Sequence, residues 1–152
     1  MPEKQTIERA KRDAREGKSP STQAGEFVRE EMEHVREGKH GARNTKQAIA
    51  IGLSKARRSG VKLPAKKGRT SASTRRKAAQ DRQASKRTRK PSRKRSRATT
   101  GALQREGRKA ASRRSLSRQA KTTAARRGQR DRSAAAKKAA RTRKRNAARK
   151  SR

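Results

Sequence analysis

Apolar side chains recur at helical spacing in three stretches of the first 64 residues. In the second stretch they fall within one broad arc when successive residues turn by about 100°. These side chains are Ala24, Phe27, Val28, Met32 and Val35. The pattern predicts an amphipathic helix over about 21–37, which Ser19 or Ser21 opens and Gly38 follows.

The third stretch is the best-defined helix in the sequence and is predicted over about 45–58. Asn44 is a favoured N-cap, and Gln47 three residues later completes a pattern close to a capping box. Gly60 occupies the position after the helix end where a left-handed backbone is common. Gly52 costs about 1 kcal/mol relative to alanine in a helix interior, so we expect another backbone to pack closely against it.

The first stretch has a thinner apolar pattern and predicts a short helix over about 7–16, capped by Thr6 and ended by Gly17. The tetrapeptide Arg-Glu-Gly-Lys occurs at 15–18 and again at 36–39, each time at a predicted helix end. We interpret both copies as the same helix-ending sequence and not as part of a structural repeat.

Large apolar residues are concentrated before Pro64, and only Leu103 and Leu116 follow it. We therefore predict a small all-α N-terminal domain of two to three helices over residues 1–64. Residues 65–152 contain too little apolar surface to offset chain entropy. They are predicted to form a long basic tail that is largely disordered or conditionally helical.

Two helices are expected within this tail, over about 112–127 and 134–150. Alanine, lysine and arginine favour the helix, but like charges at i, i+4 oppose it in free solution. We therefore expect these helices when a polyanion neutralises the charge.

Charge is distributed very unevenly along the chain, whose formal net charge is +38. Residues 1–37 carry −1, residues 38–64 carry +7 and residues 65–152 carry +32. Nucleic acid is the abundant cellular polyanion, and a protein that neutralises its phosphates releases condensed counterions. The asymmetry therefore predicts nucleic-acid binding.

The predicted phosphate contacts are the lysines and arginines that end the third helix or cluster in the tail. They are Arg57, Arg58, Lys62, Lys66, Lys67, Arg69, Arg75, Arg76, Lys77, Lys86, Arg87, Arg89, Lys90, Arg93, Lys94, Arg95, Arg113, Arg114, Arg126, Arg127, Lys137, Lys138, Arg141, Arg143, Lys144 and Arg145. Phosphate contacts position a protein without reading bases. Single-strand binders stack bases on aromatic rings, and Phe27, the only aromatic residue, is predicted to lie in the core. This favours duplex DNA, with RNA as the alternative.

A second surface is predicted to contact protein. Four glutamates form an acidic stripe on the polar face of the second helix, and they are Glu26, Glu30, Glu33 and Glu37. Ile51 points away from the apolar face of the third helix, next to basic residues. These residues predict a site for self-association or for a protein partner, although an ordinary solvated helix face is the more common explanation of such a stripe.

Catalytic and metal chemistry are not expected. The chain has no cysteine, and its two histidines, His34 and His40, are predicted to be surface residues on a charged helix and loop. We predict no enzyme activity, no cofactor and no metal site. Neither a run of about 18 apolar residues nor a signal-peptide core is present, so we expect no membrane partner and a cytoplasmic, nucleoid-associated protein.

Two strings in the predicted domain carry a family resemblance. The segment that begins Ser19-Pro-Ser-Thr-Gln-Ala-Gly-Glu-Phe-Val and the segment Gly38-Lys-His-Gly-Ala-Arg-Asn-Thr-Lys-Gln-Ala resemble a family of small basic bacterial proteins of unknown function. Members of that family are sometimes labelled plasmid-stabilisation or DNA-binding proteins. The tail resembles, in composition, the Lys/Arg/Ala-rich tails of bacterial histone H1-like proteins. The resemblance implies DNA binding and brings no catalytic residues.

The sequence therefore predicts non-sequence-specific DNA binding that coats or compacts DNA through the tail. Two alternatives stay open: an RNA- or ribosome-associated basic protein, and a protein-interaction module that the tail tethers to nucleic acid.

Overall fold

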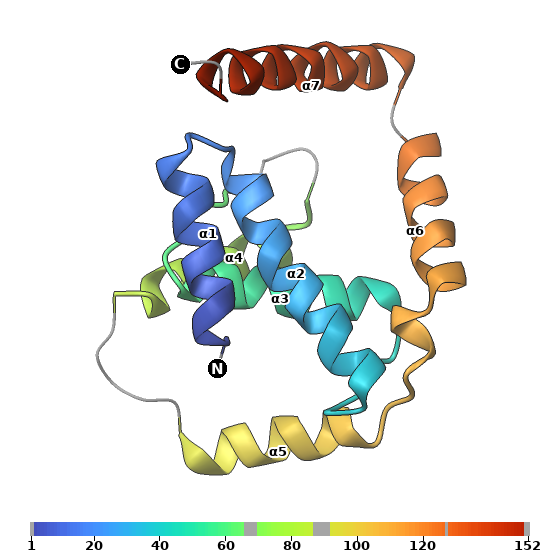
Figure 1. Ribbon diagram of the computed structural model, residues 1–152. Helices are drawn as coiled ribbons and strands as arrows, with labels where there is room; N and C mark the ends of the chain where they lie inside the picture. Colours follow the sequence, from blue (N-terminus) through green and yellow to red (C-terminus); the bar gives the residue numbers. More distant parts are fainter. Residues whose placement is uncertain (1, 66–69, 87–91, 127, 151–152) are drawn as a thin grey trace. The chain divides into compact units, whose positions relative to one another are not determined.

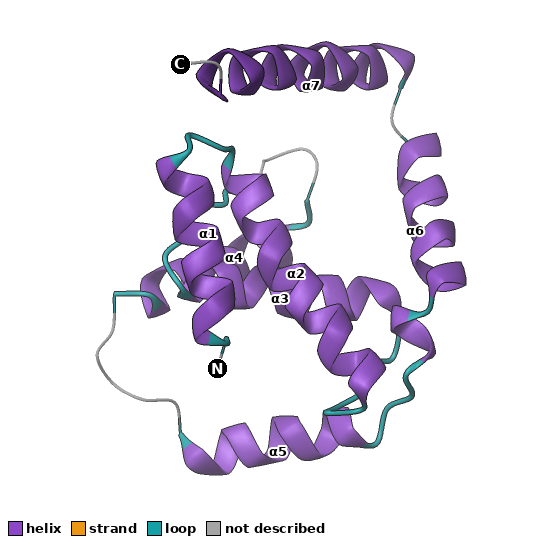
Figure 2. Ribbon diagram, in the orientation of Figure 1, coloured by secondary structure: helices purple, strands orange, loops and turns teal. Residues whose placement is uncertain are grey.

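The computed structural model describes residues 2–65, 70–86, 92–126 and 128–150. Its first three helices are α1 (Lys4–Arg15), α2 (Pro20–Glu37) and α3 (Thr45–Arg58). Figure 1 shows α1 and α2 packed side by side and antiparallel, with α3 crossing α2. Helix is the only regular secondary structure in the described part of the chain (Figure 2).

Local sequence explains where α2 and α3 begin. The Ser19 hydroxyl accepts a hydrogen bond from the Thr22 amide, and the Asn44 side chain accepts one from the Gln47 amide. The predicted N-cap Asn44 is therefore confirmed, and of the two serines that the sequence offered, Ser19 caps α2. The prediction that Thr6 caps the first helix is wrong, because α1 begins earlier and Thr6 is fully buried within it.

The three helices end in the same way, with a glycine in the left-handed region. Gly17, Gly38 and Gly60 have φ of 70°, 79° and 93°. In each case the glycine amide and the next amide donate to carbonyls of the last helical turn, as Gly60 does to Arg57 and Val61 does to Ala56. This is the Schellman arrangement, which favours glycine because a side chain is strained at positive φ.

Gly52 allows α2 and α3 to approach closely. A Cβ atom placed on Gly52 would lie 2.7 Å from the Cα of Val28 and 3.0 Å from the carbonyl oxygen of Phe27. The predicted close backbone contact is therefore confirmed. The small core beside it is formed by Ala10, Ala24, Phe27, Ala56 and Val61, with Ile7, Leu53 and Leu63 packed against them.

The predicted fold class is wrong. Instead of two to three helices followed by a largely disordered or conditionally helical tail, helices continue through the described residues. They are α4 (Ala72–Ala84), α5 (Arg93–Gln104), the 3-10 helix η1 (Lys109–Ala111), α6 (Arg113–Ala125) and α7 (Gln129–Lys150). The high helix propensity of alanine, lysine and arginine explains part of this result, and serine caps explain more. Ser71 accepts from the Thr74 amide at the start of α4, and Ser112 accepts from the Ser115 amide at the start of α6.

Helix α4 packs against α3 through one buried aspartate. Asp81 is 1% exposed and accepts hydrogen bonds from the Ser54 hydroxyl at 2.7 Å and from Arg58 Nε at 3.0 Å. Ala78, one turn earlier, is 6% exposed. The hydrogen bonds of Asp81 therefore hold α4 on α3 without the large apolar side chains that this region lacks.

Residues 103–111 fold back onto the loop between α2 and α3. The Gly41 amide donates to the Leu103 carbonyl at 2.9 Å, and the Ala42 amide donates to the Gly107 carbonyl at 3.1 Å. In η1, Ala110 and Ala111 are buried, and the Ala110 carbonyl accepts from the Thr45 hydroxyl at 2.7 Å. Backbone hydrogen bonds and two small side chains thus hold this segment in place.

The described chain divides into two units, residues 1–115 and residues 116–152. The first unit holds α1 to α5 and η1, together with the first residues of α6. The second unit holds the rest of α6 and all of α7.

Candidate nucleic-acid interface

Helix α7 carries the densest group of predicted phosphate contacts. Its 22 residues include ten lysines and arginines and one acidic residue, Asp131. The predicted contacts on this helix are exposed, and they are Lys137, Lys138, Arg141, Arg143, Lys144 and Arg145. At about 100° per residue, all of them except Arg143 fall within an arc of about 120°. The helix therefore orders five cations into one broad face.

Helices α5 and α6 begin with cations. Arg93, Lys94 and Arg95 form the first turn of α5, Arg113 and Arg114 open α6, and all five are exposed. The positive end of the helix dipole makes this placement unfavourable by about 0.3–1 kcal/mol per charge, unless an anion is present. Backbone amides at a helix start also favour a phosphate. Both helix starts are therefore suited to phosphate.

Of the predicted contacts near α4, some are exposed to solvent and one, Arg75, is hydrogen-bonded within the protein. Lys62, Arg76 and Lys86 are exposed. Arg75 is half-buried and donates to the Thr70 carbonyl at 3.0 Å. Arg126, which follows α6, is also exposed.

Three predicted phosphate contacts take part in the fold. Arg57 donates to the Leu63 carbonyl at 3.2 Å. Arg58 and Lys77 lie 3.0 Å and 3.5 Å from the same oxygen of Asp81. Arg58 therefore joins α3 to α4, while Lys77, which lies in α4 with Asp81, adds to the neutralisation of the buried carboxylate.

Seven further predicted contacts lie outside the described residues. They are Lys66, Lys67, Arg69, Arg87, Arg89, Lys90 and Arg127.

Ionised Asp81 is favoured by its neighbours. Burial raises its pKa, but the hydrogen bonds from Ser54 and Arg58 and the charges of Lys77 and Arg58 outweigh burial, so the pKa lies below the usual 3.8. Because the native pKa is lowered, this carboxylate stabilises the fold above the unfolded-state pKa. The contribution disappears as pH falls through the native pKa.

Replacing Asp81 with asparagine is expected to destabilise the protein by about 1–2 kcal/mol at pH 7, since both cationic partners are partly exposed and screened. The difference between the two proteins should persist down to about pH 4 and shrink toward zero below it. Urea unfolding at several pH values measures this. A difference that stays constant down to pH 2, well below the usual aspartate pKa, would contradict the assignment.

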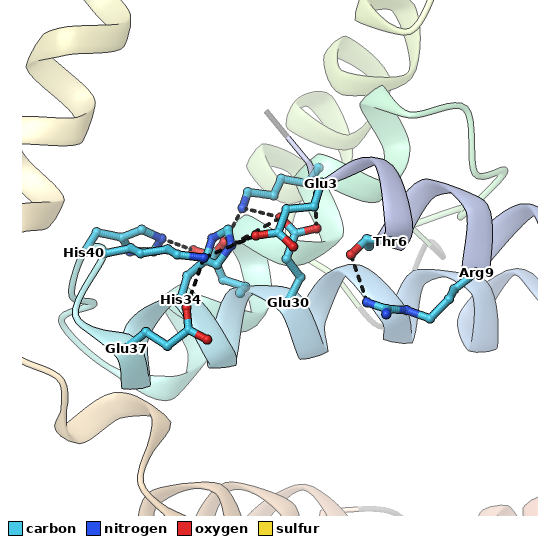
Figure 3. Close-up of polar contacts among 10 residues, drawn as sticks. Glu3, Thr6, Arg9, Glu30, His34, Glu37 and His40 are labelled. Atoms are coloured by element: carbon cyan, nitrogen blue, oxygen red, sulfur yellow. Dashed lines mark hydrogen bonds and ion pairs between the residues drawn. The ribbon is translucent and has the colours of Figure 1, made fainter.

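The predicted acidic stripe is largely occupied by contacts within the first unit. Glu30 is 2% exposed, so it is not part of an exposed surface. One of its oxygens lies 3.2 Å from Lys55 Nζ, and the other accepts from the Glu3 amide at 3.2 Å. Figure 3 shows Glu30 beside Glu3 and His34.

The other stripe residues pair with nearby cations of the first unit. Glu26 lies 3.0 Å from Arg9 Nε in α1. Glu33 lies 3.0 Å from Arg29, and Glu37 lies 3.0 Å from Lys39. Ile51 is half-buried.

Sequence reasoning missed the role of Glu31. This residue is fully buried, and one of its oxygens lies 2.7 Å from Lys55 Nζ. It falls inside the apolar arc of α2, between Phe27 and Val35. A carboxylate on an apolar face is the sequence signal that could have revealed it.

Residues 19–67 match the model of a family of unknown function (DUF6496). The matched segment includes α2 and α3 and agrees with the resemblance to an uncharacterised family. No curated protein and no solved structure matches the chain.

Among the described helices, none combines the length and apolar character needed to cross a membrane.

Proposed function

We propose that this protein binds duplex DNA without sequence preference and coats or compacts it through its basic helices. The observation that carries the proposal is the exposed cationic face of α7, formed by Lys137, Lys138, Arg141, Lys144 and Arg145. A helix of 22 residues is about 33 Å long. Over that length a duplex presents roughly twenty phosphates, at one charge per ~1.7 Å of its axis. One helix can therefore engage several phosphates at once.

The excess of positive charge after Pro64 supports binding of an external polyanion. Thirty-five lysines and arginines there face three acidic residues, Asp81, Glu106 and Asp131. Asp81 is already shared by Arg58 and Lys77. The surplus of cations repels itself and attracts anions, and phosphates relieve this repulsion.

The position of Phe27 favours duplex over single-stranded nucleic acid. The side chain of this only aromatic residue is 1% exposed and lies in the core. No phenylalanine, tyrosine or tryptophan ring is left to stack a splayed base, which is the usual basis of single-strand binding. Binding through phosphates alone does not require side chains that hydrogen-bond to base edges. A nucleoid location and a histone-like role are part of this proposal.

A set of four substitutions on α7 tests the proposal in the full-length protein. Lys137, Lys138, Arg141 and Lys144 are replaced together by glutamine, and binding to a fluorescent duplex is measured over a range of salt concentrations. Each lost phosphate contact should reduce the log–log salt slope by about 0.9, so the slope should become shallower by up to about 4.

The matched control removes the same charge from α1. Lys4, Lys11, Arg12 and Arg15 are exposed and are replaced by glutamine in a second variant. Its slope should stay near the wild-type value, because α1 carries none of the proposed contacts. Equal slopes for the two variants would show that net charge alone governs binding. Competition between duplex DNA and structured RNA at matched salt separates DNA binding from the RNA alternative.

A further inference from the structure

Two histidines and one glutamate meet where α2 ends. Glu31, His34 and His40 each offer a ligand atom, and these atoms lie within 4.8 Å of one another. Glu31 and His34 are three residues apart on α2 and so share a face of the helix. The left-handed turn at Gly38 reverses the chain and brings His40 back to them. Figure 3 shows His34 and His40 adjacent at this end of α2.

The carboxylate of Glu31 is poorly satisfied for a buried charge. Its side chain is fully buried, and Oε1 accepts no hydrogen bond from the described residues. Lys55 Nζ lies 2.7 Å from Oε2, and His40 Nε2 lies 3.4 Å from Oε1. Buried carboxylates normally accept several hydrogen bonds, because desolvation of an unpaired oxygen is costly. The Oε1 atom therefore lacks a close partner.

The ring of His40 is oriented as a metal ligand would be. Its Nδ1 lies 3.0 Å from the Gly41 carbonyl, which can only accept, so Nδ1 carries the proton. In the neutral ring, Nε2 then holds a lone pair that faces the oxygen of Glu31. Two acceptors facing each other at 3.4 Å require either a second proton or a cation between them. Metal-bound histidines characteristically donate their other ring N–H to a carbonyl or carboxylate.

One separation within the cluster matches a tetrahedral ion. With bonds of about 2.0–2.1 Å, ligand atoms around zinc are separated by roughly 3.3–3.4 Å. The 3.4 Å between His40 Nε2 and Glu31 Oε1 matches this edge. Glu3 Oε1 lies 3.0 Å from His34 Nε2 and is the nearest additional carboxylate.

The charges around the cluster leave room for a cation. Three carboxylates converge here, from Glu3, Glu30 and Glu31, and two ammonium groups approach them, from Lys39 and Lys55. The loop that carries His40 is also held, because Gly41 and Ala42 donate to residues 103 and 107. The ligands are therefore positioned by elements far apart in the sequence.

We propose that Glu31, His34 and His40 bind one divalent transition-metal ion of the zinc class, with Glu3 or water as a fourth ligand. A set of two histidines and one carboxylate is typical of zinc and related ions. The proposal does not depend on DNA binding.

The chain has only two histidines, which makes the test direct. Full-length protein, freed of nucleic acid at high salt and of metal by a chelator, is titrated with Zn²⁺. Calorimetry should show one saturable site, and the ring signals of both His34 and His40 should shift together in ¹H–¹⁵N spectra. Ring signals that do not respond to Zn²⁺ would overturn the proposal without any variant.

Substitutions then assign the ligands. Glu31→Gln and His40→Gln should each weaken Zn²⁺ binding by more than the roughly 10–100-fold that loss of an outer-shell partner causes. Glu33→Gln is the matched control, since Glu33 lies on α2, is partly exposed and pairs with Arg29. Circular dichroism verifies that each variant is helical. Binding by both ligand variants at wild-type strength would refute the site, as would equal weakening by the control.

Discussion

Raising the salt concentration from 50 to 200 mM is expected to weaken binding of the full-length protein to duplex DNA by about 10³–10⁵-fold. Each phosphate contact releases condensed counterions, and added salt opposes that release. With about ten contacts, a plot of log affinity against log salt should have a slope near −9. Ten contacts are within reach, because eleven of the predicted phosphate contacts on α5, α6 and α7 are exposed. Fluorescence anisotropy with a labelled duplex of mixed sequence measures the slope.

Duplexes of unrelated sequence provide the control for specificity. Phosphate contacts carry no sequence information, so the affinities should agree within a few-fold at every salt concentration. A slope near zero would contradict phosphate binding altogether. A steep slope with a strong preference for one sequence would instead require base contacts, which no residue has been assigned to make.

Replacing Gly41 with alanine is expected to detach residues 103–111 from the rest of the first unit. A Cβ atom at this position would overlap the carbonyl oxygen of Glu106, which is a backbone atom and cannot rotate away. Overpacking of a well-fitted contact costs about 1–3 kcal/mol, and a backbone clash belongs at the upper end of that range. Because Gly41 also donates to the Leu103 carbonyl, the clash breaks the hydrogen bond that holds the segment.

Hydrogen exchange measures this effect at two named amides. The Gly41 and Ala42 amides donate to Leu103 and Gly107, so both should exchange faster in the variant, and the melting temperature should fall. Gly107→Ala is the matched control, since nothing lies within 4 Å of a Cβ placed there. Unchanged protection at both amides in Gly41→Ala would show that the segment is not docked as described.

Local signals in the sequence were sufficient for the first three helices. Asn44, Gly38 and Gly60 mark helix ends through interactions with residues only a few positions away. The close approach at Gly52 could also be expected, because glycine in a helix interior is unfavourable without a reason in packing. The prediction for Thr6 was wrong because threonine occurs both as an N-cap and as a buried residue within a helix, and the sequence does not distinguish the two.

The prediction of a tail over residues 65–152 was wrong because it assumed that only large apolar side chains can hold a helix against the rest of the protein. Asp81 fastens α4 with hydrogen bonds and ion pairs, and Ala110 and Ala111 are buried by lying close to backbone. Neither mechanism needs a large side chain. Glutamates of α2 were likewise treated as one surface, yet Glu30 is buried and Glu33 is partly exposed.

The sequence by itself determined the surplus of positive charge and the presence of a single Phe, Tyr or Trp residue, because both follow from composition. It also determined where α2 and α3 begin and end, because helix ends depend on neighbouring residues. Only the tertiary structure decided that residues 103–111 dock beside Gly41 and that Glu31, His34 and His40 converge. Such contacts depend on how a left-handed turn and a returning backbone place atoms from outside a helix beside it. Periodicity along one helix does not encode that placement.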